Sequence, residues 1–236
     1  MQLDASQNIH NTTINYPRLY GLDGQSLIAV GEFLLEQYTA TAFSQIQQAA
    51  ELDGFNLQIC SAYRPFEKQM AIWNAKADGK RPLLDKASNP IEFNQLNEQQ
   101  LIDTILLWSA LPGASRHHWG TDMDVFDANK IDKKSLQLIT AEYIDKGPCA
   151  DLHLWLKQHA QTFGFYFPYQ PQLSGVSPEP WHLSYFPLAD QYLAQFSITE
   201  LAKILSNAEI SLKSSLLERL TDLVEHYVFF VAPSPT

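Results

Sequence analysis

Cysteine is scarce in this chain of 236 residues, where only Cys60 and Cys149 occur, far apart and outside any CxxC spacing. This scarcity excludes a framework of several disulfides and a cysteine-based zinc site of the usual spacing. Because isolated cysteines behave as small apolar residues and are often buried, we expect two free thiols in a reducing compartment.

Long apolar runs and basic segments are missing as well. No stretch reaches the ~18 apolar residues of a membrane span, and the start, MQLDASQNIHNTT, lacks the basic and apolar regions of a signal peptide. We therefore expect no transmembrane segment and a cytoplasmic protein, or a periplasmic one if a leader has been removed. With 16 lysines and arginines against 26 acidic residues, the net charge of -10 argues against nucleic acid as a partner.

The first half of the chain alternates between helical and extended patterns. The polar, turn-rich first ~25 residues predict a surface arm, and a helix is expected to follow and to end at about Leu52. Apolar and polar residues alternate over 55–60, which predicts a strand that runs into Tyr63-Arg64-Pro65. An apolar stripe predicts a helix from Pro65 to Gly79, and a loop is expected at 80–93.

The middle of the chain predicts further short strands. Asn97 and Gln100 have the spacing of a capping box, and the helix that they open is expected to end at Pro112-Gly113. A later helix is expected to be capped by Asp151 and ended by Gly164. Strands are predicted at 125–127, 165–167 and 181–185. Short strands with long connections predict an α+β fold, a small central antiparallel sheet flanked by helices.

From about residue 188 only helices are predicted. Ser197 and Glu200 have the spacing of a second capping box, and an apolar stripe follows from Leu212 to Tyr227. We divide the chain into a domain of residues 1–187 and a helical extension of residues 188–236 packed on it. Residues 228–231 are expected to be the last buried anchor.

The segment Ser115–Asp124, SRHHWGTDMD, concentrates side chains that can bind a metal ion. Residues two apart in a strand share a face, so Asp122 and Asp124 could both point to one place. Gly120 permits a turn that brings His117 back to the same place. One imidazole and one carboxylate would give two of the three protein ligands of a catalytic zinc site.

A second motif supplies a candidate third ligand. Glu179 precedes His182 by three residues, so the histidine could bind the metal while the glutamate lies beside the metal's water as a general base. Pro180 restricts Glu179 to extended geometry. A lone His-Asp pair is more often a surface hydrogen bond, and a lone arginine such as Arg64 is more often a surface ion pair. The two motifs together favour the metal site.

These stretches resemble the zinc D-Ala-D-Ala carboxypeptidases of the VanY kind, in the group that includes VanX-type dipeptidases and the hedgehog signalling domain. The matching positions of the patterns SxHxxGxAxD, YR and ExWH are Ser115, His117, Gly120 and Asp124, then Tyr63 and Arg64, then Glu179, Trp181 and His182. The resemblance spans roughly Phe55 to Tyr185.

The resemblance implies a fold like that of the hedgehog domain and these peptidases. It also implies that His117, Asp124 and His182 bind zinc, that Glu179 is the base and proton shuttle, and that Arg64 steadies the oxyanion. The substrate-binding residues that we expect are Ser115, Gln69, Tyr63 and Trp181.

Several neighbours of the motifs are open to more than one interpretation. Asp122 stands where the family has alanine, so it could be a partner for a ligand histidine or could repel an acidic substrate group. His118 lies beside a ligand but outside the pattern, which favours an ordinary residue over a supporting role next to the metal ligands. Trp119 and Trp181 are expected to wall the pocket. The histidines expected to be ordinary are His10, His153, His159 and His226.

The implied function is removal of a terminal D-alanine from peptidoglycan stem peptides, at a D,D or an L,D bond, with a peptidoglycan peptide or muropeptide as the partner. One alternative is an endopeptidase of the same chemistry that cuts cross-links. The other is a zinc-containing binding module that has lost catalysis, against which the presence of Glu179 and Arg64 speaks. The sequence does not indicate an oligomeric state.

Overall fold

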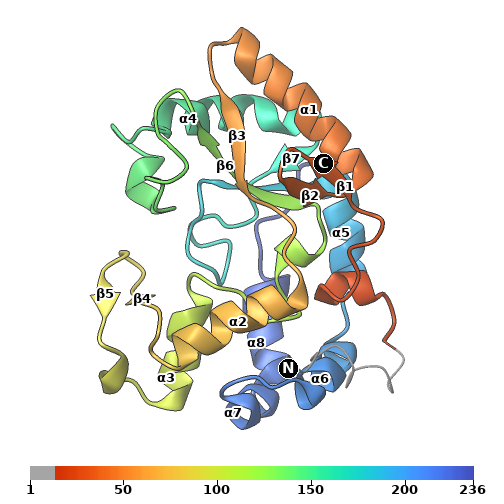
Figure 1. Ribbon diagram of the computed structural model, residues 1–236, viewed down its shortest axis with the longest axis vertical. Coiled ribbons are helices and arrows are strands. Elements are labelled where there is room, and N and C mark those ends of the chain that lie inside the picture. The colour runs from red at the N-terminus through yellow and green to blue at the C-terminus, as the bar shows by residue number, and fades with distance from the viewer. Residues whose placement is uncertain (1–13) are drawn as a thin grey trace.

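The computed structural model describes residues 14–236, so His10 and most of the expected N-terminal arm lie outside the described residues. Its centre is a four-stranded antiparallel sheet in the order β3-β6-β8-β7. Figure 1 labels β3, β6 and β7 of this sheet. The strands are β3 (Leu57–Ser61), β6 (Asp122–Asp127), β7 (Phe165–Tyr166) and β8 (His182–Tyr185). The predicted α+β fold with a small antiparallel sheet is confirmed.

The sheet has one apolar face and one polar face. Leu57, Val125 and Leu183 are fully buried on the apolar face, in a core shared with helices α1 (Gln37–Leu52) and α4 (Ala150–His159). Successive side chains of a strand point to opposite faces, so Asp122, Asp124 and His182 come to the other face. The alternation in the sequence therefore places the motif carboxylates away from the apolar core.

Two hairpins were not predicted. Strands β1 (Ile28–Val30) and β2 (Phe33–Leu35) pair before α1, where only arm and helix were expected. Strands β4 (Leu83–Leu84) and β5 (Pro90–Ile91) pair within the segment expected to be a loop. Strands of two or three residues are too short to give a visible alternation, so sequence periodicity does not find them.

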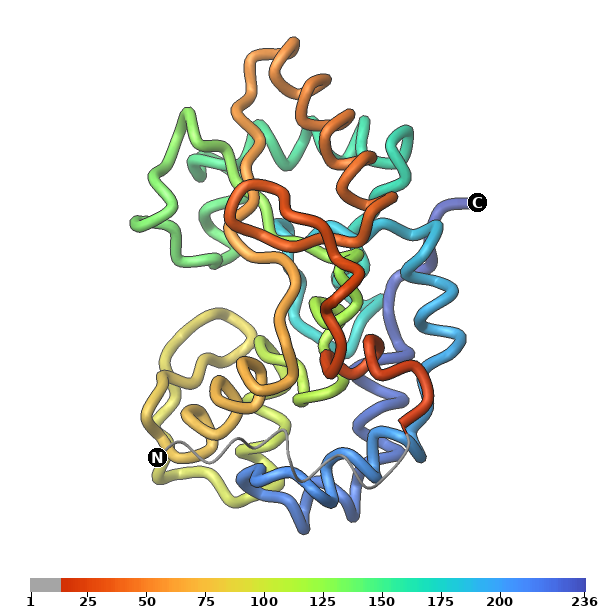
Figure 2. The backbone as a smooth tube through the Cα atoms, turned by 45° about the vertical axis from the view of Figure 1, so that its right-hand side comes forward, coloured from red at the N-terminus to blue at the C-terminus, as the bar shows by residue number. Residues whose placement is uncertain are grey.

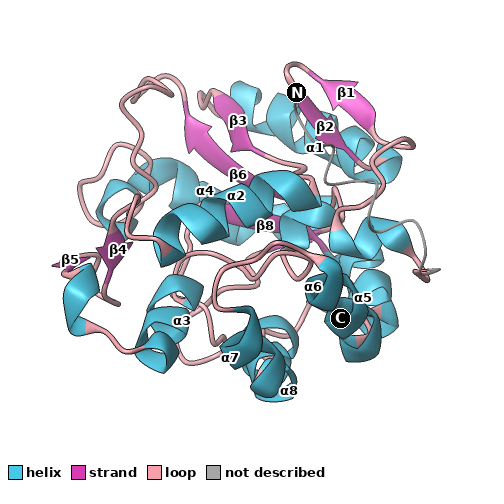
Figure 3. Ribbon diagram, turned by 60° about the horizontal axis from the view of Figure 1, so that its bottom comes forward, coloured by secondary structure: helices cyan, strands magenta, loops and turns pink. Residues whose placement is uncertain are grey.

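The other half of the molecule is helical (Figure 3). Its helices are α2 (Phe66–Ala77), α3 (Glu98–Leu106), α5 (Phe186–Gln195), α6 (Ile198–Asn207), α7 (Lys213–Glu218) and α8 (Leu220–Val224), followed by a π-helix, Glu225–Phe229. Trp73 of α2, Ile105 of α3, and Leu201, Leu205 and Leu223 of the C-terminal helices belong to one buried core. The helices after residue 186 therefore share a core with α2 and α3.

The helix ends confirm some predictions and correct others. The reciprocal box of Asn97 and Gln100 is present, but α3 ends at Leu106, well before Pro112. Cys149 is the N-cap of α4, so the prediction of Asp151 is wrong, and Asp151 lies in the first turn instead, where its charge suits the helix N-terminus. Gly164 ends the following short helix at φ 81°, as expected.

The second predicted capping box is only half formed. Ser197 accepts a hydrogen bond from the Glu200 N–H, but the Glu200 carboxylate is bound to the Asn15 N–H and to Lys203. The Ser197 N–H donates instead to the hydroxyl of Tyr20, so the N-terminal segment completes the cap of α6.

The C-terminal anchor is smaller than predicted. Val228 is buried, but Phe230 is 43% exposed, and Ala232 is the buried residue beyond it. Cys60 and Cys149 are both free thiols. No helix within residues 14–236 combines the length and the apolar character needed to cross a bilayer.

Candidate metal centre

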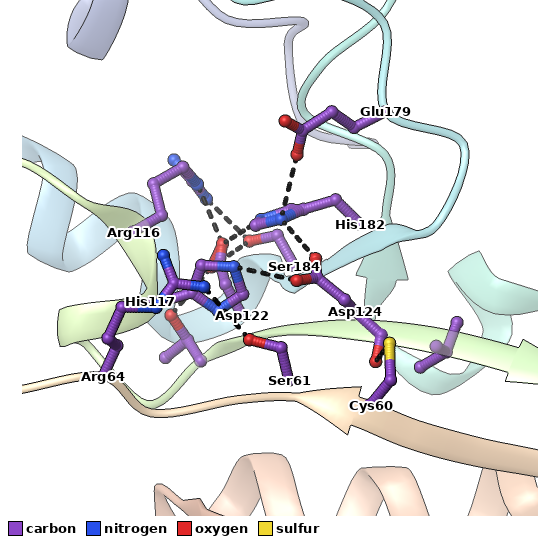
Figure 4. A network of polar contacts seen from close by, with 12 residues as sticks. Cys60, Ser61, Arg64, Arg116, His117, Asp122, Asp124, Glu179, His182 and Ser184 are labelled. Atoms are coloured by element: carbon purple, nitrogen blue, oxygen red, sulfur yellow. Dashed lines mark hydrogen bonds and ion pairs between the residues drawn. The ribbon is translucent and has the colours of Figure 1, made fainter. Parts of the chain in front are cut away.

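Three donor side chains meet on the polar face of the sheet. Asp124 of β6 and His182 of β8 are directly paired across the strands, which places their side chains side by side. His117 comes from the short helix Arg116–His118, just before β6. Asp124 lies 3.4 Å from Nε2 of His117 and 3.1 Å from Nδ1 of His182 (Figure 4).

This donor set fits a zinc-like ion. One atom from each residue lies within 4.8 Å of the others, and ligands ~2.0–2.2 Å from a tetrahedral ion are separated by roughly 3.3–3.6 Å. All three side chains are buried, and two imidazoles with one carboxylate are a common ligand set of catalytic zinc. The three residues predicted from the sequence are thus brought together.

The electrostatics of the three groups show why a cation suits them. Burial lowers the pKa of His117. Burial alone would raise the pKa of Asp124, but the adjacent His117 lowers it well below its usual range, so the carboxylate stays ionised. Burial would also lower the pKa of His182, but hydrogen bonds to Asp122 and Asp124 raise it to about 9. The ionised carboxylate therefore draws positive charge to the site, which the proton on His182 supplies in the metal-free protein and a bound cation would supply in its place.

Asp122 belongs to a buried network behind His182. Its carboxylate accepts hydrogen bonds from Arg116 Nε at 2.8 Å and from Ser184 Oγ at 2.9 Å, and Arg116 also donates to Ser184 at 2.6 Å. Asp122 Oδ2 lies 3.4 Å from His182 Nε2 (Figure 4). A proton held on Nε2 leaves Nδ1, which faces Asp124, free for a metal.

The pairing with Arg116 distinguishes between the two interpretations of Asp122. Burial would raise the pKa of Asp122, but the Arg116 guanidinium lowers it, so the carboxylate is ionised and its charge is neutralised by a residue inside the protein. A neutralised carboxylate directed at His182 acts as a partner of that histidine rather than as a group that repels substrate.

Glu179 lies at the edge of the donor set. Its Oε2 is 3.5 Å from His182 Nδ1, and its side chain is 12% exposed. Burial raises its pKa to about 8, which is near the pH at which a group can both take and give a proton. The Glu179 N–H donates to the carbonyl of Tyr169, which holds the loop before β8.

Arg64 lies between the end of β3 and the start of α2. Figure 2 shows this part of the chain as the orange tube that runs from one half of the molecule to the other. Its guanidinium donates to Gln69 Oε1 at 2.7 Å and to Ser61 Oγ at 3.1 Å. The Gln69 amide donates in turn to the carbonyl of Ala110 at 2.6 Å. Both ends of Gln69 are therefore occupied, and its contact is with Arg64 rather than with the cavity.

His118, the residue after His117, connects Arg64 to the segment that carries the proposed ligands. Gly113 N–H donates to its Nε2, so Nδ1 carries the proton and donates to the carbonyl of Arg64. His118 is fully buried, and burial lowers its pKa to about 3. It does not join the donor set, and its structural role is to hold Arg64 in place.

A cavity of about 300 Å³ opens onto the donor set. Of the other predicted residues, Ser115 and Trp181 line it. Tyr63 does not line it and directs its hydroxyl to the Gly21 carbonyl. The prediction for Trp119 is wrong, because this side chain is fully buried beneath Arg116 and donates to the Leu19 carbonyl.

The sequence did not point to several residues of this cavity, including Trp108, Tyr169, Lys76 and Arg81. Trp108 stacks on Trp181 with ring centroids 6.2 Å apart. Tyr169 lies against the ring of His182, with centroids 4.8 Å apart. Aromatic residues next to prolines, as at 166–171, were the only signal for Tyr169. Lys76 and Arg81 are indistinguishable in sequence from ordinary surface charges.

Known proteins match this chain over the same region. The model of the family VanY, D-alanyl-D-alanine carboxypeptidase, matches residues 32–188. A Haemophilus influenzae protein described only as uncharacterized is 35% identical over 121 residues, which are 50% of this chain and 92% of that protein. A second one is 44% identical over 77 residues, which are 33% of this chain and 53% of that protein.

One relative carries a functional name. An Enterococcus faecalis D-alanyl-D-alanine carboxypeptidase is 29% identical over 141 residues, which are 58% of this chain and 42% of that protein. This relative and the shorter Haemophilus match are thus covered over only about half of their own length.

Solved structures share the fold. VanYB in complex with D-alanine-D-alanine has a TM-score of 0.52 at 22% identity, covering 83% of this chain and 97% of that chain. A mutant of the vancomycin-resistance D,D-pentapeptidase VanY in complex with Zn(II) has a TM-score of 0.51 at 24% identity, covering 72% and 86%. Because the family model covers well over half of the chain, this protein belongs to the VanY D-alanyl-D-alanine carboxypeptidase family.

Proposed function

We propose that this protein is a zinc-dependent carboxypeptidase that removes a terminal D-alanine from peptidoglycan stem peptides. The observation that carries the proposal is the position of Glu179, 3.5 Å from His182 and in one cavity with the donor set and Arg64. The names of the relatives, which include a carboxypeptidase and a complex with D-alanine-D-alanine, support a peptide with this terminus as substrate.

His117, Asp124 and His182 would hold the zinc ion. When bound there, zinc would supply Lewis-acid chemistry, because it polarises the scissile carbonyl and lowers the pKa of water. The buried network of Asp122 and Arg116 keeps the proton of His182 on Nε2 and so keeps Nδ1 available.

Glu179 would move the proton. Its carboxylate would take a proton from the attacking water and pass it to the nitrogen of the leaving D-alanine, so that the C–N bond breaks as an amine leaves. The raised pKa of this group, about 8, suits both steps near neutral pH.

Arg64 would stabilise the negative charge that develops on the carbonyl oxygen. Its guanidinium donates hydrogen bonds to Gln69 and Ser61, and its backbone carbonyl accepts one from His118. The side chain is therefore oriented before the substrate arrives. A charge fixed in advance stabilises a transition state without paying for reorganisation.

The test is release of D-alanine from a muramyl pentapeptide and a tetrapeptide by the zinc-loaded protein, with Glu179→Gln as the comparison. We expect the wild type to release D-alanine from at least one peptide and Glu179→Gln to retain zinc but lose about 10²–10⁴-fold in kcat. Mass spectrometry of the products separates loss of a terminal residue from cleavage of cross-links. Absence of D-alanine release from both peptides, or full activity of Glu179→Gln, would contradict the proposal.

A further inference from the structure

The loop that carries Glu179 is bound by a distant part of the chain. Residues 168–180, here called the base loop, connect β7 to β8 and contain no helix or strand. Residues 230–236, here called the tail, follow the π-helix and lie against this loop. The Ala232 N–H donates to the Pro168 carbonyl at 2.9 Å, and the Gly175 N–H donates to the Phe230 carbonyl at 3.3 Å. The tail therefore holds the base loop at two points.

The first of these hydrogen bonds lies next to the support of Glu179. The Pro168 carbonyl belongs to the peptide unit that joins Pro168 to Tyr169. The Tyr169 carbonyl accepts a hydrogen bond from the Glu179 N–H at 3.2 Å, and the Tyr169 ring lies against the ring of His182. By fixing the orientation of that peptide unit, Ala232 fixes the residue that supports the backbone of Glu179.

The second contact depends on glycine. Gly175 approaches the π-helix so closely that a Cβ at this position would overlap with a backbone carbonyl oxygen of that helix. The next residue, Val176, lines a small cavity with apolar residues of α8 and the π-helix. The other backbone hydrogen bond that joins the base loop to a distant segment of residues 14–236 runs from the Ser177 N–H to the Leu107 carbonyl. The tail and the helices before it thus supply most of the support of this loop.

The tail is itself fixed to the rest of the molecule. Ala232 is buried, and Ser234 Oγ donates to the carboxylate of Asp190 in α5 at 2.6 Å. Pro235 lines a second cavity together with Glu179, on the side of the base loop that faces α4. The tail is therefore anchored on both sides of its contacts with the loop.

We propose that the tail is a clamp that positions Glu179 for proton transfer. This inference rests on the proposed function, because it takes Glu179 as the base. The tail lies outside residues 32–188, which the family model matches, so the clamp is a feature that the family match does not describe. A misplacement of roughly 1 Å in a reacting group can cost about 10²-fold in rate. Because His117 and Asp124 come from other segments, loosening the loop should affect proton transfer far more than zinc binding.

The first test removes one hydrogen bond of the clamp. Ala232→Pro lacks the N–H that donates to Pro168, whereas Ala232→Gly keeps it and is the matched control. We expect Ala232→Pro to lower kcat for D-alanine release about 10-fold to 100-fold with little change in KM or zinc content, and Ala232→Gly to lose far less. A role in stability alone would lower the free energy of unfolding and leave kcat of the folded protein unchanged.

The second test displaces the loop at Gly175 and remains decisive if Ala232→Pro does not fold. Gly175→Ala places a methyl group against the backbone of the π-helix, and we expect a loss in kcat of the same order. Gly31→Asn, in the turn between β1 and β2, is the control. The position has open space around it, and asparagine tolerates its φ of 59°.

Hydrogen exchange tests the clamp without hydrolysis. The backbone amides of positions 175 and 179 should exchange faster in Ala232→Pro and Gly175→Ala than in the wild type. Unchanged exchange in both variants would overturn the proposal, as would faster exchange with unchanged kcat, or a loss carried entirely by KM. Wild-type protein that releases no D-alanine would contradict the proposed function instead, and exchange would still decide whether the tail holds the loop.

Discussion

The cavity beside the donor set has two sides, a sheet wall formed by β6 and β8 and a helix wall formed by α2 and the turn that follows it. The charged residues of these two walls differ in whether they are paired. On the sheet wall, Asp122 is paired with Arg116, and Asp124 lies against two imidazoles. On the helix wall, Lys76 and Arg81 face the same space, which Glu179 also lines, and the ion pairs found within residues 14–236 include neither of them. Groups that satisfy one another keep their geometry in the free protein, whereas unpaired groups depend on a ligand. The charges of the sheet wall therefore hold one another in place, whereas the two cations of the helix wall are not held by an ion pair among the described residues.

The largest effect should come from removing His182, one of the three proposed metal ligands. His182→Ala removes one of three donors, and we expect the protein to lose its bound zinc together with its peptidase activity. Elemental analysis and D-alanine release measure the two losses. His226→Ala changes an exposed histidine and should affect neither. Stoichiometric zinc in His182→Ala would contradict the assigned ligand set.

The next effect concerns the pair of Arg116 and Asp122. Arg116→Met removes the guanidinium that neutralises the buried Asp122 and leaves it with His182 and hydroxyl groups such as that of Ser184, so we expect a loss of up to about 3–5 kcal/mol in the free energy of unfolding. Asp122→Ala should weaken zinc about 10-fold to 100-fold, because His182 loses the group that orients it.

The double variant provides the control for this pair. Arg116→Met with Asp122→Ala removes both charges, so it should be more stable than Arg116→Met alone. Urea unfolding and zinc titration measure the two effects. A double variant less stable than both single variants would contradict this view of the pair.

The third prediction concerns His118, whose burial should make the free energy of unfolding depend on pH. Unfolded His118 binds a proton below pH ~6.5, but the folded protein holds this ring neutral until the pKa of about 3. The unfolded state therefore gains protons first as the pH falls. The stability contributed by neutral His118 should decrease by ~1.4 kcal/mol per pH unit below ~6.5.

The measurement is urea unfolding of zinc-free protein between pH 4.5 and 7.5. His118→Gln replaces the ring with an amide that does not titrate, so the difference between variant and wild type should shrink as the pH falls. A difference that is constant across this range would rule out titration of His118 as the cause.

The smallest effect on stability should come from the C-terminal helices. Ser197→Ala removes the side-chain cap of α6, and we expect a loss of about 1 kcal/mol in stability. Because α6 lies away from the cavity, kcat and KM should remain unchanged. Ser214→Ala, an exposed serine of α7, is the control. A change in KM larger than that of the control would show that the cap reaches the cavity.

The sequence predicted the sheet wall better than the helix wall. Alternation along β6 and the pattern ExWH place Asp124, His182 and Glu179 through local rules, because a strand presents every second side chain to one face. The partner of Asp122 was not predicted, since Arg116 reaches it only after the turn at Gly120 folds the segment back. Lys76 and Arg81 carry no local signal either, because their place in the cavity depends on how α2 is held in the core of the helical half.

The shared core of α2 and the C-terminal helices has a consequence for dissecting this protein. The family match ends at residue 188, but the indole of Trp73 donates to the carbonyl of Ser211, and Asn74 binds Ser211 and Glu209. Excision at residue 188 would expose to water the part of α2 that packs against the C-terminal helices. We expect the evolutionary module and the cooperative folding unit to have different boundaries, so that a minimal enzyme must include the last 48 residues.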